Sequence, residues 1–376
     1  MSSDPTRIGA GAGLAAARPV LPPGVFCAQD YERLAEERLS PAVFAHTAGG
    51  SGGEAALARN RSAFEAAVTT PRMLVDFDGA NTRARVGGID LPHPILLAPL
   101  AHQGLYHPQG ELETAQAAAV VGAGLVCSTL SSNSLEDIAE AAGPARWFQL
   151  YLQPDWAVSL DLVRRAEAAG YQGLVLTVDA PVQTPSLRAL RAGFTGEGSV
   201  AANLTAYPAP APPPLASGES RVFGGPMRQA PRLSDIGRLK AETRLPLWIK
   251  GVLHREDARQ FLAAGADGLI VSNHGGRAFD GAPAALSALP AVREAVGDTV
   301  PVLMDGGVRS GRDVFTAIAH GADAVLVGRL QAYALAVAGA LGVAHMIRLL
   351  REELELNMAL AGCPDLAAIR RLDAAT

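Results

Sequence analysis

The chain has 376 residues, of which 49% are hydrophobic and 18% charged, and its formal net charge is -5 at pH 7. This length permits a large core, and the acidic balance excludes a general attraction to nucleic acid. The cysteines Cys27, Cys127 and Cys363 are odd in number and widely spaced, which argues against a disulfide framework and a C-x-x-C metal site. We therefore expect no metal and a reducing, cytoplasmic setting.

The first 25 residues are rich in alanine, glycine and proline, and they lack the basic start and compact apolar centre of a secretory signal. We expect a flexible tail over residues 1–25, followed by a single domain over residues 26–376. The glycine-rich run at residues 9–13 follows no predicted strand, so we assign it to this tail. No apolar run is expected to span a membrane.

After about residue 90 the sequence alternates between short apolar runs and amphipathic helical patterns. Each apolar run is nearly continuous, as expected for a strand that is buried on both faces. Helical patterns lie between the runs, for example at residues 111–121, 156–168, 255–264 and 309–319. Eight strands are predicted, at residues 95–100, 124–129, 146–152, 173–179, 247–252, 268–274, 301–307 and 324–329.

Repeated β-then-α units of this number predict a (β/α)8 barrel, or TIM barrel. The alternative is a doubly wound sheet, which normally carries a G-x-G-x-x-G turn after its first strand. The sequence APLA at residues 98–101 does not resemble that turn. An N-terminal helical segment at residues 31–67 is expected to pack on the outside of the barrel. A further helix with an apolar stripe is expected at residues 342–360.

One connection is much longer than the others, between the fourth strand, which ends at Asp179, and the fifth, which begins at Leu247. It contains the run PAPAPPP at residues 208–214, and proline at this density blocks helix and central strand alike. A long loop at the active-site end of a barrel is usually a lid or a disordered insert. We expect residues 185–232 to form such an active-site loop.

Polar residues collect at the carboxyl ends of the predicted strands, where enzymes of this fold carry out their chemistry. Lys250 directly follows an apolar run, so its ammonium group needs an anion near the barrel axis. That anion is either a bound ligand or simply Asp179 or Asp305. The candidate site positions at these strand ends, most of them polar, are Ala101 and His102, Ser128, Gln149, Tyr151, Thr177, Asp179, Lys250, Ser272, His274, Arg277, Asp305, Arg309, Gly328 and Arg329.

The last two predicted strands lead into Asp305-Gly306-Gly307-Val308-Arg309 and Gly328-Arg329. Loops after strands seven and eight are the usual phosphate site of the fold. Glycines let backbone N–H groups approach a phosphate, and two arginines can hold it bidentately. The alternative is that these are surface arginines beside ordinary turns. The sequence thus indicates a phosphate-bearing cofactor whose reactive ring lies near Lys250.

Five motifs follow one another along the chain: FQLY at 148–151, LTVD at 176–179, IKGV at 249–252, SNHGGR at 272–277 and DGGVRSG at 305–311. Together they resemble the FMN-dependent L-2-hydroxy acid oxidases and dehydrogenases, the family of glycolate, lactate and mandelate oxidases. The resemblance covers residues 31–372. The sequences RML at 72–74 and MALAGC at 358–363 are most similar to the hydroxymandelate oxidase branch.

The resemblance implies FMN as the cofactor and assigns a role to most of the polar residues. His274 would be the catalytic base, Tyr151 would polarise the substrate oxygen, and Arg277 would clamp the substrate carboxylate. Asp179 would stabilise the imidazolium that forms, and Lys250 the negative charge on the flavin. The flavin ring would contact Ala101 through its backbone, and Ser128, Gln149, Thr177, Lys250 and Ser272. The ribityl chain would contact Asp305, and the phosphate would contact Gly307, Arg309, Gly328 and Arg329.

Two substrate-binding positions depart from the family pattern. The family carries a second substrate arginine after strand four, and an ungapped alignment places Ser186 there. The family also has a tyrosine or phenylalanine in the N-terminal segment, where this chain has His46. Loss of one charged hydrogen bond costs about 1.5–3 kcal/mol. Either Arg277 suffices alone, His46 or Arg188 replaces the missing arm, or the substrate is bulkier or lacks a simple carboxylate.

The preferred hypothesis is an FMN enzyme that oxidises a 2-hydroxy acid, with an aryl acid such as mandelate favoured by resemblance, to the 2-keto acid. The alternative is an FMN enzyme of natural-product biosynthesis that deaminates, decarboxylates or isomerises a modified substrate, because Ser186 replaces the second arginine. A flavin-binding protein without turnover is a third hypothesis. Oxygen, a quinone or a carrier protein all remain open as electron acceptor. The family resemblance further implies a homotetramer.

Overall fold

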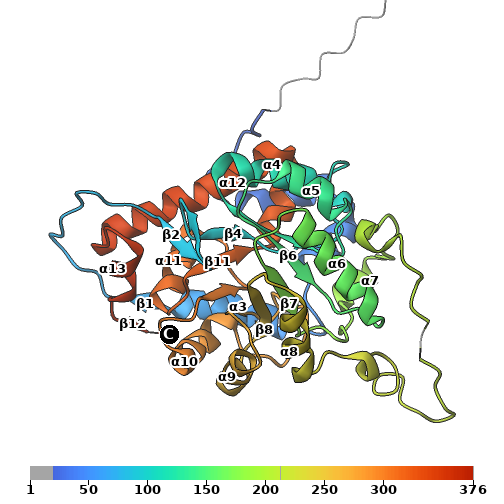
Figure 1. Ribbon diagram of the computed structural model, residues 1–376. Helices are drawn as coiled ribbons and strands as arrows, with labels where there is room; N and C mark the ends of the chain where they lie inside the picture. Colours follow the sequence, from blue (N-terminus) through green and yellow to red (C-terminus); the bar gives the residue numbers. More distant parts are fainter. Residues whose placement is uncertain (1–19, 212, 376) are drawn as a thin grey trace, which may run out of the picture.

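The computed structural model describes residues 20–211 and 213–375, so most of the predicted N-terminal tail, including residues 9–13, lies outside the described residues. A closed barrel of eight parallel strands forms the centre, in the order β10-β11-β4-β5-β6-β7-β8-β9 (Figure 1). This confirms the predicted (β/α)8 barrel. The strands are β4 (Ile95–Leu97), β5 (Gly124–Ser128), β6 (Arg146–Leu150), β7 (Leu174–Thr177), β8 (Leu247–Val252), β9 (Gly268–Val271), β10 (Val302–Asp305) and β11 (Ala324–Val327).

The barrel strands are almost entirely buried, which explains their continuous apolar sequences. Most are shorter at the carboxyl end than predicted, because the last polar residues leave the ladder and form the loops of the mouth. The antiparallel hairpin of β2 (Ala84–Val86) and β3 (Ile89–Leu91) packs at the opposite end. There a Cβ atom on Gly87 would lie 2.7 Å from the ring of Trp248, near the start of β8.

Helices surround the barrel as the sequence predicts, and polar side chains cap several of their amino ends. Ser134, Asp155 and Ser310 each accept a backbone N–H at the start of a helix. The barrel helices are α4 (Glu111–Val121), α5 (Leu135–Ala141), α6 (Trp156–Ala168), α8 (Leu233–Glu242), α9 (Arg255–Ala263), α10 (Ala285–Val296), α11 (Gly311–Ala319) and α12 (Arg329–Ala361); α13 (Leu366–Arg370) follows.

The predicted N-terminal helical segment consists of α1 (Asp30–Arg38), α2 (Pro41–Ala48) and α3 (Ala55–Ala66). Ser40 caps α2 and Pro41 occupies its first turn, where a missing N–H carries no penalty. Helix α1 packs along α12, and α3 packs against α10. The backbone carbonyls at the end of α2 face the loop after β9, since Arg277 donates to the carbonyls of His46 and Gly49.

Helix α12 is longer than the predicted residues 342–360, because it begins directly after β11 and continues across a kink at Ala338 and Gly339. By length and composition it could cross a membrane, which corrects the expectation that no apolar run is long enough. However, 56% of its most apolar stretch is buried inside the molecule. It packs against α4, α1 and α11, as the core helix of a folded domain does.

The long connection after β7 contains α7 (Leu187–Arg191) and the short 3-10 helices η2 (Ala202–Leu204) and η3 (Pro226–Gln229). Between η2 and η3 it projects from the barrel as an extended loop (Figure 1). The connection is anchored at Asn203, which is fully buried. The Asn203 amide donates to the carbonyls of Ser128 and Thr129, and its oxygen accepts the N–H of Leu135. The lid function proposed for residues 185–232 stays a prediction.

Candidate active site at the barrel mouth

The predicted catalytic base lies on a tight loop directly after β9. His274 has a backbone φ of +58°, a left-handed conformation that is uncommon outside glycine and that clusters at functional sites. Its Nδ1 lies 2.8 Å from Oδ1 of Asp179, and its Nε2 lies 3.5 Å from the hydroxyl of Tyr151. We assign the proton to Nδ1, since Asp179 can only accept. Nε2 therefore presents a lone pair beside Tyr151.

Asp179 reaches His274 because β8 contains a glycine opposite it. Gly251 has a φ of +109°, and a Cβ atom there would lie 2.5 Å from Cβ of Asp179. Burial opposes the charge of Asp179, but the neighbouring His274 and Lys250 hold the pKa of this carboxyl below its ordinary value. The ionised carboxylate accepts the hydrogen bond from Nδ1 and so fixes the imidazole orientation.

Lys250 of β8 forms a buried polar chain with Ser272, directly after β9, and with Asp305 at the end of β10. Its Nζ lies 3.0 Å from Oδ2 of Asp305 and donates to Oγ of Ser272 at 2.9 Å. Burial opposes the ammonium charge, yet Asp305 and Asp179 together raise the pKa of Lys250. The ion pair with Asp305, which the sequence left open, is therefore present. A charged lysine stays fixed near the barrel axis in a site of low dielectric.

The residues at the ends of β5, β6 and β7 fit a flavin ring. The amide oxygen of Gln149 accepts from Oγ of Ser128 and from the backbone of Thr129, which leaves its Nε2 aimed elsewhere. Nε2 of Gln149 and Oγ1 of Thr177 are buried without a hydrogen-bond partner in the described part of the chain. Buried polar atoms normally have partners, so these two indicate a polar ligand such as the carbonyl and N–H edge of a flavin. Ala101 lies in the bend after β4.

The predicted phosphate loops also fit their ligand, with one change. Gly306 and Gly307 have φ values of +97° and +90°, and Gly328 precedes the amino end of α12, where backbone N–H groups favour an anion. The side chain of Arg329, however, donates to the carbonyls of Thr47, Gly49 and Gly275. A bidentate grip by two guanidinium groups is therefore not present: Arg329 can offer its backbone N–H, and Arg309 its side chain.

Arg277, Arg309 and Arg329 concentrate positive charge at this end of the barrel. Burial, together with Arg309 and Arg277, lowers the pKa of Arg329 to about 9. Burial likewise lowers the pKa of Arg277, and no acidic side chain opposes that shift. Because like charges at close range repel unless an anion lies between them, this cluster is suited to bind phosphate and carboxylate groups.

His46 lies beside Arg277, as expected for a substrate-binding residue. Its Nε2 is 3.4 Å from the Arg277 guanidinium, and its ring stacks on Phe194 with centroids 4.0 Å apart and planes inclined by 12°. Burial, with Arg277 and His102, lowers the pKa of His46 to about 4. His46 is therefore neutral at pH 7. It adds an aromatic surface and a polar ring, and no second cation, to the Arg277 side of the site.

Ser186 lies close to the substrate clamp but does not replace it. Its hydroxyl caps α7 by accepting the N–H of Ala189 at 3.3 Å. A Cβ atom on Gly49, whose carbonyl binds Arg277, would lie 2.8 Å from this hydroxyl. Arg188 instead forms an ion pair with Glu54, and about half of its side chain is exposed. Of the candidate replacements for the missing arginine, the structure brings His46, and not Arg188, to Arg277.

Two contributors to the site have no motif in the sequence. Tyr106 is buried, accepts a hydrogen bond from Thr47 at the end of α2, and contributes to the electrostatic surroundings of Arg277. Asn60 of α3 pairs with Asn273 in the loop that carries His274. Only a contact between segments far apart in sequence identifies them. His102, predicted at the mouth, bonds the carbonyl of Val200 at 2.8 Å and so holds the long connection.

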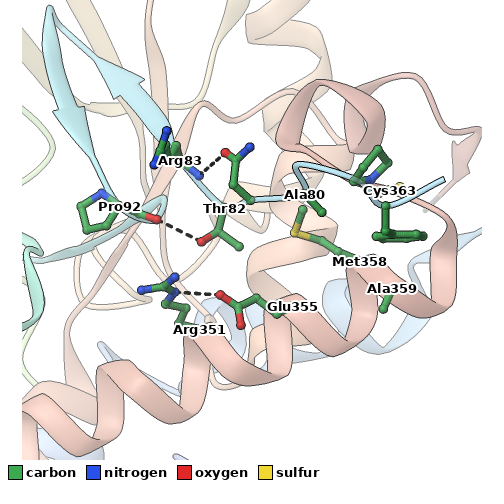
Figure 2. Close-up of a pocket in the computed structure, with 12 residues that line it drawn as sticks. Ala80, Thr82, Arg83, Pro92, Arg351, Glu355, Met358, Ala359 and Cys363 are labelled. Atoms are coloured by element: carbon green, nitrogen blue, oxygen red, sulfur yellow. Dashed lines mark hydrogen bonds and ion pairs between the residues drawn. The ribbon is translucent and has the colours of Figure 1, made fainter.

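A separate cavity of about 490 Å³ lies at the other end of the barrel, beside the segment that leads into β4 (Figure 2). Figure 2 shows Arg351 and Glu355 of α12 paired across from Thr82, with Met358 and Cys363 farther along the lining. None of the predicted site residues lines it. In the part of the chain that the structure describes, no group of three or more His, Cys, Asp or Glu side chains is arranged to hold a metal ion.

The barrel, the arginine cluster and the flavin-side donors agree with comparisons to known proteins. The model of the FMN-dependent dehydrogenase family matches residues 35–375. The chain belongs to this family. A relative, the L-lactate oxidase of Alicycliphilus denitrificans, is 61% identical over 350 residues, which cover 93% of this chain and 96% of the relative. The 4-hydroxymandelate oxidase of Amycolatopsis orientalis is 46% identical over 347 residues, 92% of this chain and 96% of the relative.

Solved structures give the same result. A crystal structure of mandelate oxidase superimposes with a TM-score of 0.84 at 42% identity, covering 93% of this chain and 98% of that one. A mandelate oxidase variant solved with (S)-mandelic acid matches with a TM-score of 0.84 at 43% identity over the same shares. This member of the FMN-dependent dehydrogenase family is therefore an oxidoreductase with FMN as its cofactor.

Proposed function

We propose that this chain oxidises a 2-hydroxy acid to the corresponding 2-keto acid. The observation that carries the proposal is the position of Arg277. Its half-buried guanidinium has no acidic partner among the residues that the structure describes, and it lies next to Tyr151 and the His274–Asp179 pair. An arginine in that setting favours a planar anion, and a carboxylate fits it. Relatives named L-lactate oxidase and 4-hydroxymandelate oxidase act on such acids.

The residues divide the reaction between them. Arg277 binds the substrate carboxylate and thereby places the carbon that carries the hydroxyl near Nε2 of His274. His274 takes up a proton from the substrate at Nε2, and Asp179 stabilises the imidazolium through Nδ1. Tyr151, whose pKa burial raises to about 12, stays protonated and can donate to the substrate oxygen. FMN, when bound, supplies a two-electron acceptor, and Lys250 stabilises negative charge beside it.

The alternative with a modified, non-carboxylate substrate rests only on Ser186. It is not favoured, because the comparisons give oxidases of 2-hydroxy acids and because Arg277 remains in place. A single clamp arm instead predicts weak substrate binding: one missing charged hydrogen bond of about 1.5–3 kcal/mol corresponds to roughly tenfold to a hundredfold in affinity. The neutral ring of His46 can restore part of this lost binding free energy as a hydrogen-bond donor.

For the substrate side chain, we propose an aryl group. The stacked rings of His46 and Phe194 form an aromatic surface beside Arg277, and serine at position 186 takes less space than the arginine of the family pattern. Offset stacking against such a surface contributes about 0.5–1.5 kcal/mol beyond buried area. An aryl acid such as mandelate should therefore bind more tightly than lactate, by about threefold to tenfold.

Anaerobic titration tests both the reaction and the side chain. Purified protein with FMN is mixed with mandelate or lactate, and loss of the oxidised flavin absorbance is followed together with the keto acid formed. The proposal expects bleaching by a 2-hydroxy acid, one keto acid per flavin, and tighter binding of mandelate. No bleaching by either acid would contradict the proposed reaction. Equal or tighter binding of lactate would contradict the aryl preference alone.

The exposed surface and the cysteines bear on assembly and compartment. We propose a homo-oligomer, a tetramer by resemblance, because Met73, Leu74, Leu356 and Leu360 are exposed on two segments joined by the bond from Arg72 N–H to the Ala361 carbonyl. Sedimentation of a monomer at micromolar concentration would contradict this. A reducing, cytoplasmic setting is supported by Cys27, Cys127 and Cys363, all of which are free thiols.

A further inference from the structure

Helix α3 lies outside the barrel, yet one of its turns contacts both loops on which the site depends. These are the base loop, residues 272–277, which carries His274, and the phosphate loop, residues 305–309, which follows β10. Asn60 and Arg61 occupy this turn, and Asn60 is only 1% exposed. They are more than 200 residues away from either loop along the chain. None of the family motifs includes them.

Asn60 bonds the base loop through a reciprocal pair of amides. Its Nδ2 donates to Oδ1 of Asn273 at 2.8 Å, and Nδ2 of Asn273 donates back to Oδ1 of Asn60 at 2.9 Å. Oδ1 of Asn273 also accepts the N–H of Gly276 at 3.1 Å. Residues 274–276 all have positive φ, which is costly for His274 but not for the two glycines that follow it. The amide pair thus holds Asn273, whose side chain closes the turn that carries His274.

The same turn of α3 lies against the phosphate loop. A Cβ atom on Gly307 would lie 2.9 Å from the carbonyl oxygen of Asn60, and one on Gly306 would lie 3.3 Å from its Nδ2. Arg61 donates to the carbonyl of Gly307 and to Oδ2 of Asp313. That carboxylate oxygen also accepts the N–H of Arg309 at 2.8 Å. The phosphate loop therefore rests on the backbone of α3 and on both side chains.

We propose that Asn60 is a positioning residue that couples the phosphate loop to the catalytic base. Because it touches both loops and is itself buried, a shift of the phosphate loop must move the Asn60–Asn273 pair, and with it the turn at His274. The FMN phosphate then does more than hold the cofactor: it fixes the loop against which the base is aligned. The inference rests on the proposed function only for the role of His274.

The first test compares two ligands that differ by the phosphate. Apoprotein of the wild type and of Asn60→Ala is titrated with FMN and with riboflavin, and quenching of flavin fluorescence gives both dissociation constants. Asn60→Ala should weaken FMN about tenfold, the effect of one or two buried hydrogen bonds, and riboflavin much less. Thr82→Val is the matched control, since it removes one buried hydrogen bond, to the Pro92 carbonyl, at the opposite end of the barrel. Thr82→Val should leave the ratio of the FMN and riboflavin dissociation constants at its wild-type value.

The second test uses Asn60→Asp, which keeps the shape of the side chain. A charged carboxylate faces Oδ1 of Asn273 with no proton to donate, whereas a neutral carboxyl group can both donate to Asn273 and accept from it, as the amide does. The charged and titratable side chains of the surrounding elements, Arg61, Arg309 and Asp313 with His274 next to Asn273, are the same in the wild type. As the pH falls, the FMN affinity of the variant and its rate of flavin reduction by mandelate should both approach the values of the wild type measured at the same pH.

The outcomes separate a positioning role from a merely structural one. If Asn60→Ala lowers the melting temperature as Thr82→Val does, but keeps the wild-type ratio of FMN to riboflavin affinity, the coupling is refuted. A constant ratio of Asn60→Asp to wild-type FMN affinity over pH would refute it as well. Neither binding measurement needs a substrate, so a failure of the proposed oxidation would not be mistaken for a failure of the coupling.

Discussion

At the scale of single residues, we propose that substrate binding depends on Arg277. Its guanidinium is held by the carbonyls of His46 and Gly49, so its orientation is set before substrate arrives. The sequence left Arg188 as a candidate for the second arginine, but Arg188 forms an ion pair with Glu54 near the surface. Of the candidates for the missing second arginine, His46 lies beside Arg277, and it is neutral at pH 7.

Substitution of the two arginines should separate these roles. Arg277→Met should raise the substrate concentration needed for half-maximal flavin reduction by tenfold to a hundredfold or more, as expected when a charged hydrogen bond of about 1.5–3 kcal/mol is lost. Arg188→Met is the matched control and should change this value less than twofold, since an exposed ion pair contributes at most about 1 kcal/mol to stability. Rapid-mixing measurements with mandelate give both values. A comparable loss in Arg188→Met would show that Arg188 holds the carboxylate.

At the scale of elements, the apolar runs and their polar ends predicted the barrel because both follow from local sequence. A strand buried on two faces must be apolar over most of its length, and residues near its carboxyl end at the mouth can be polar, as Gln149 in β6 and Lys250 in β8 are. Where a long side chain points is a different matter. Arg329 stands in the predicted phosphate motif, yet its guanidinium donates to the carbonyls of Thr47, Gly49 and Gly275. This orientation follows from the packing of α2 on the barrel.

The contacts of Asn60 and Asn203 could not be predicted from the sequence either. Each is a single asparagine without a motif, and each acts through segments more than 60 residues away. The length of α12 was underestimated for a related reason: Gly339 interrupts the helical pattern, and the chain continues the helix only after a kink. In all three places the tertiary structure decides between local alternatives.

The long connection after β7 should depend on Asn203. This side chain makes hydrogen bonds to four partners, the carbonyls of Ser128 and Thr129, the N–H of Leu135 and the hydroxyl of Ser131. Asn203→Ala should lower the free energy of unfolding by about 1–3 kcal/mol and speed proteolytic cleavage within residues 205–230. Thr205→Ala, which removes only an exposed bond to the Ala202 carbonyl, is the control. Equal cleavage rates for the two variants would show that Asn203 does not anchor the loop.

For the whole molecule, buried histidines make stability depend on pH. The pKa values of His46 and His93 are both lowered to about 4, chiefly by burial. The unfolded chain takes up these protons near pH 6.5, and the folded chain only near pH 4. Stability is therefore lost as the pH falls through this window. His46→Gln should show a smaller drop in denaturant midpoint between pH 7 and pH 4.5 than the wild type. An unchanged drop would mean that His46 is already protonated in the folded protein.

The central claim is that FMN bound at the barrel mouth lies within reach of one base, His274. The measurement that tests it most directly is anaerobic flavin reduction by mandelate in the wild type and in His274→Ala. Both proteins should bind FMN with similar affinity, and the variant should reduce it roughly 10²–10⁴-fold more slowly, the usual contribution of a general base. Reduction at the wild-type rate in His274→Ala would contradict the assignment, and failure of the wild-type protein to bind FMN would contradict the account as a whole.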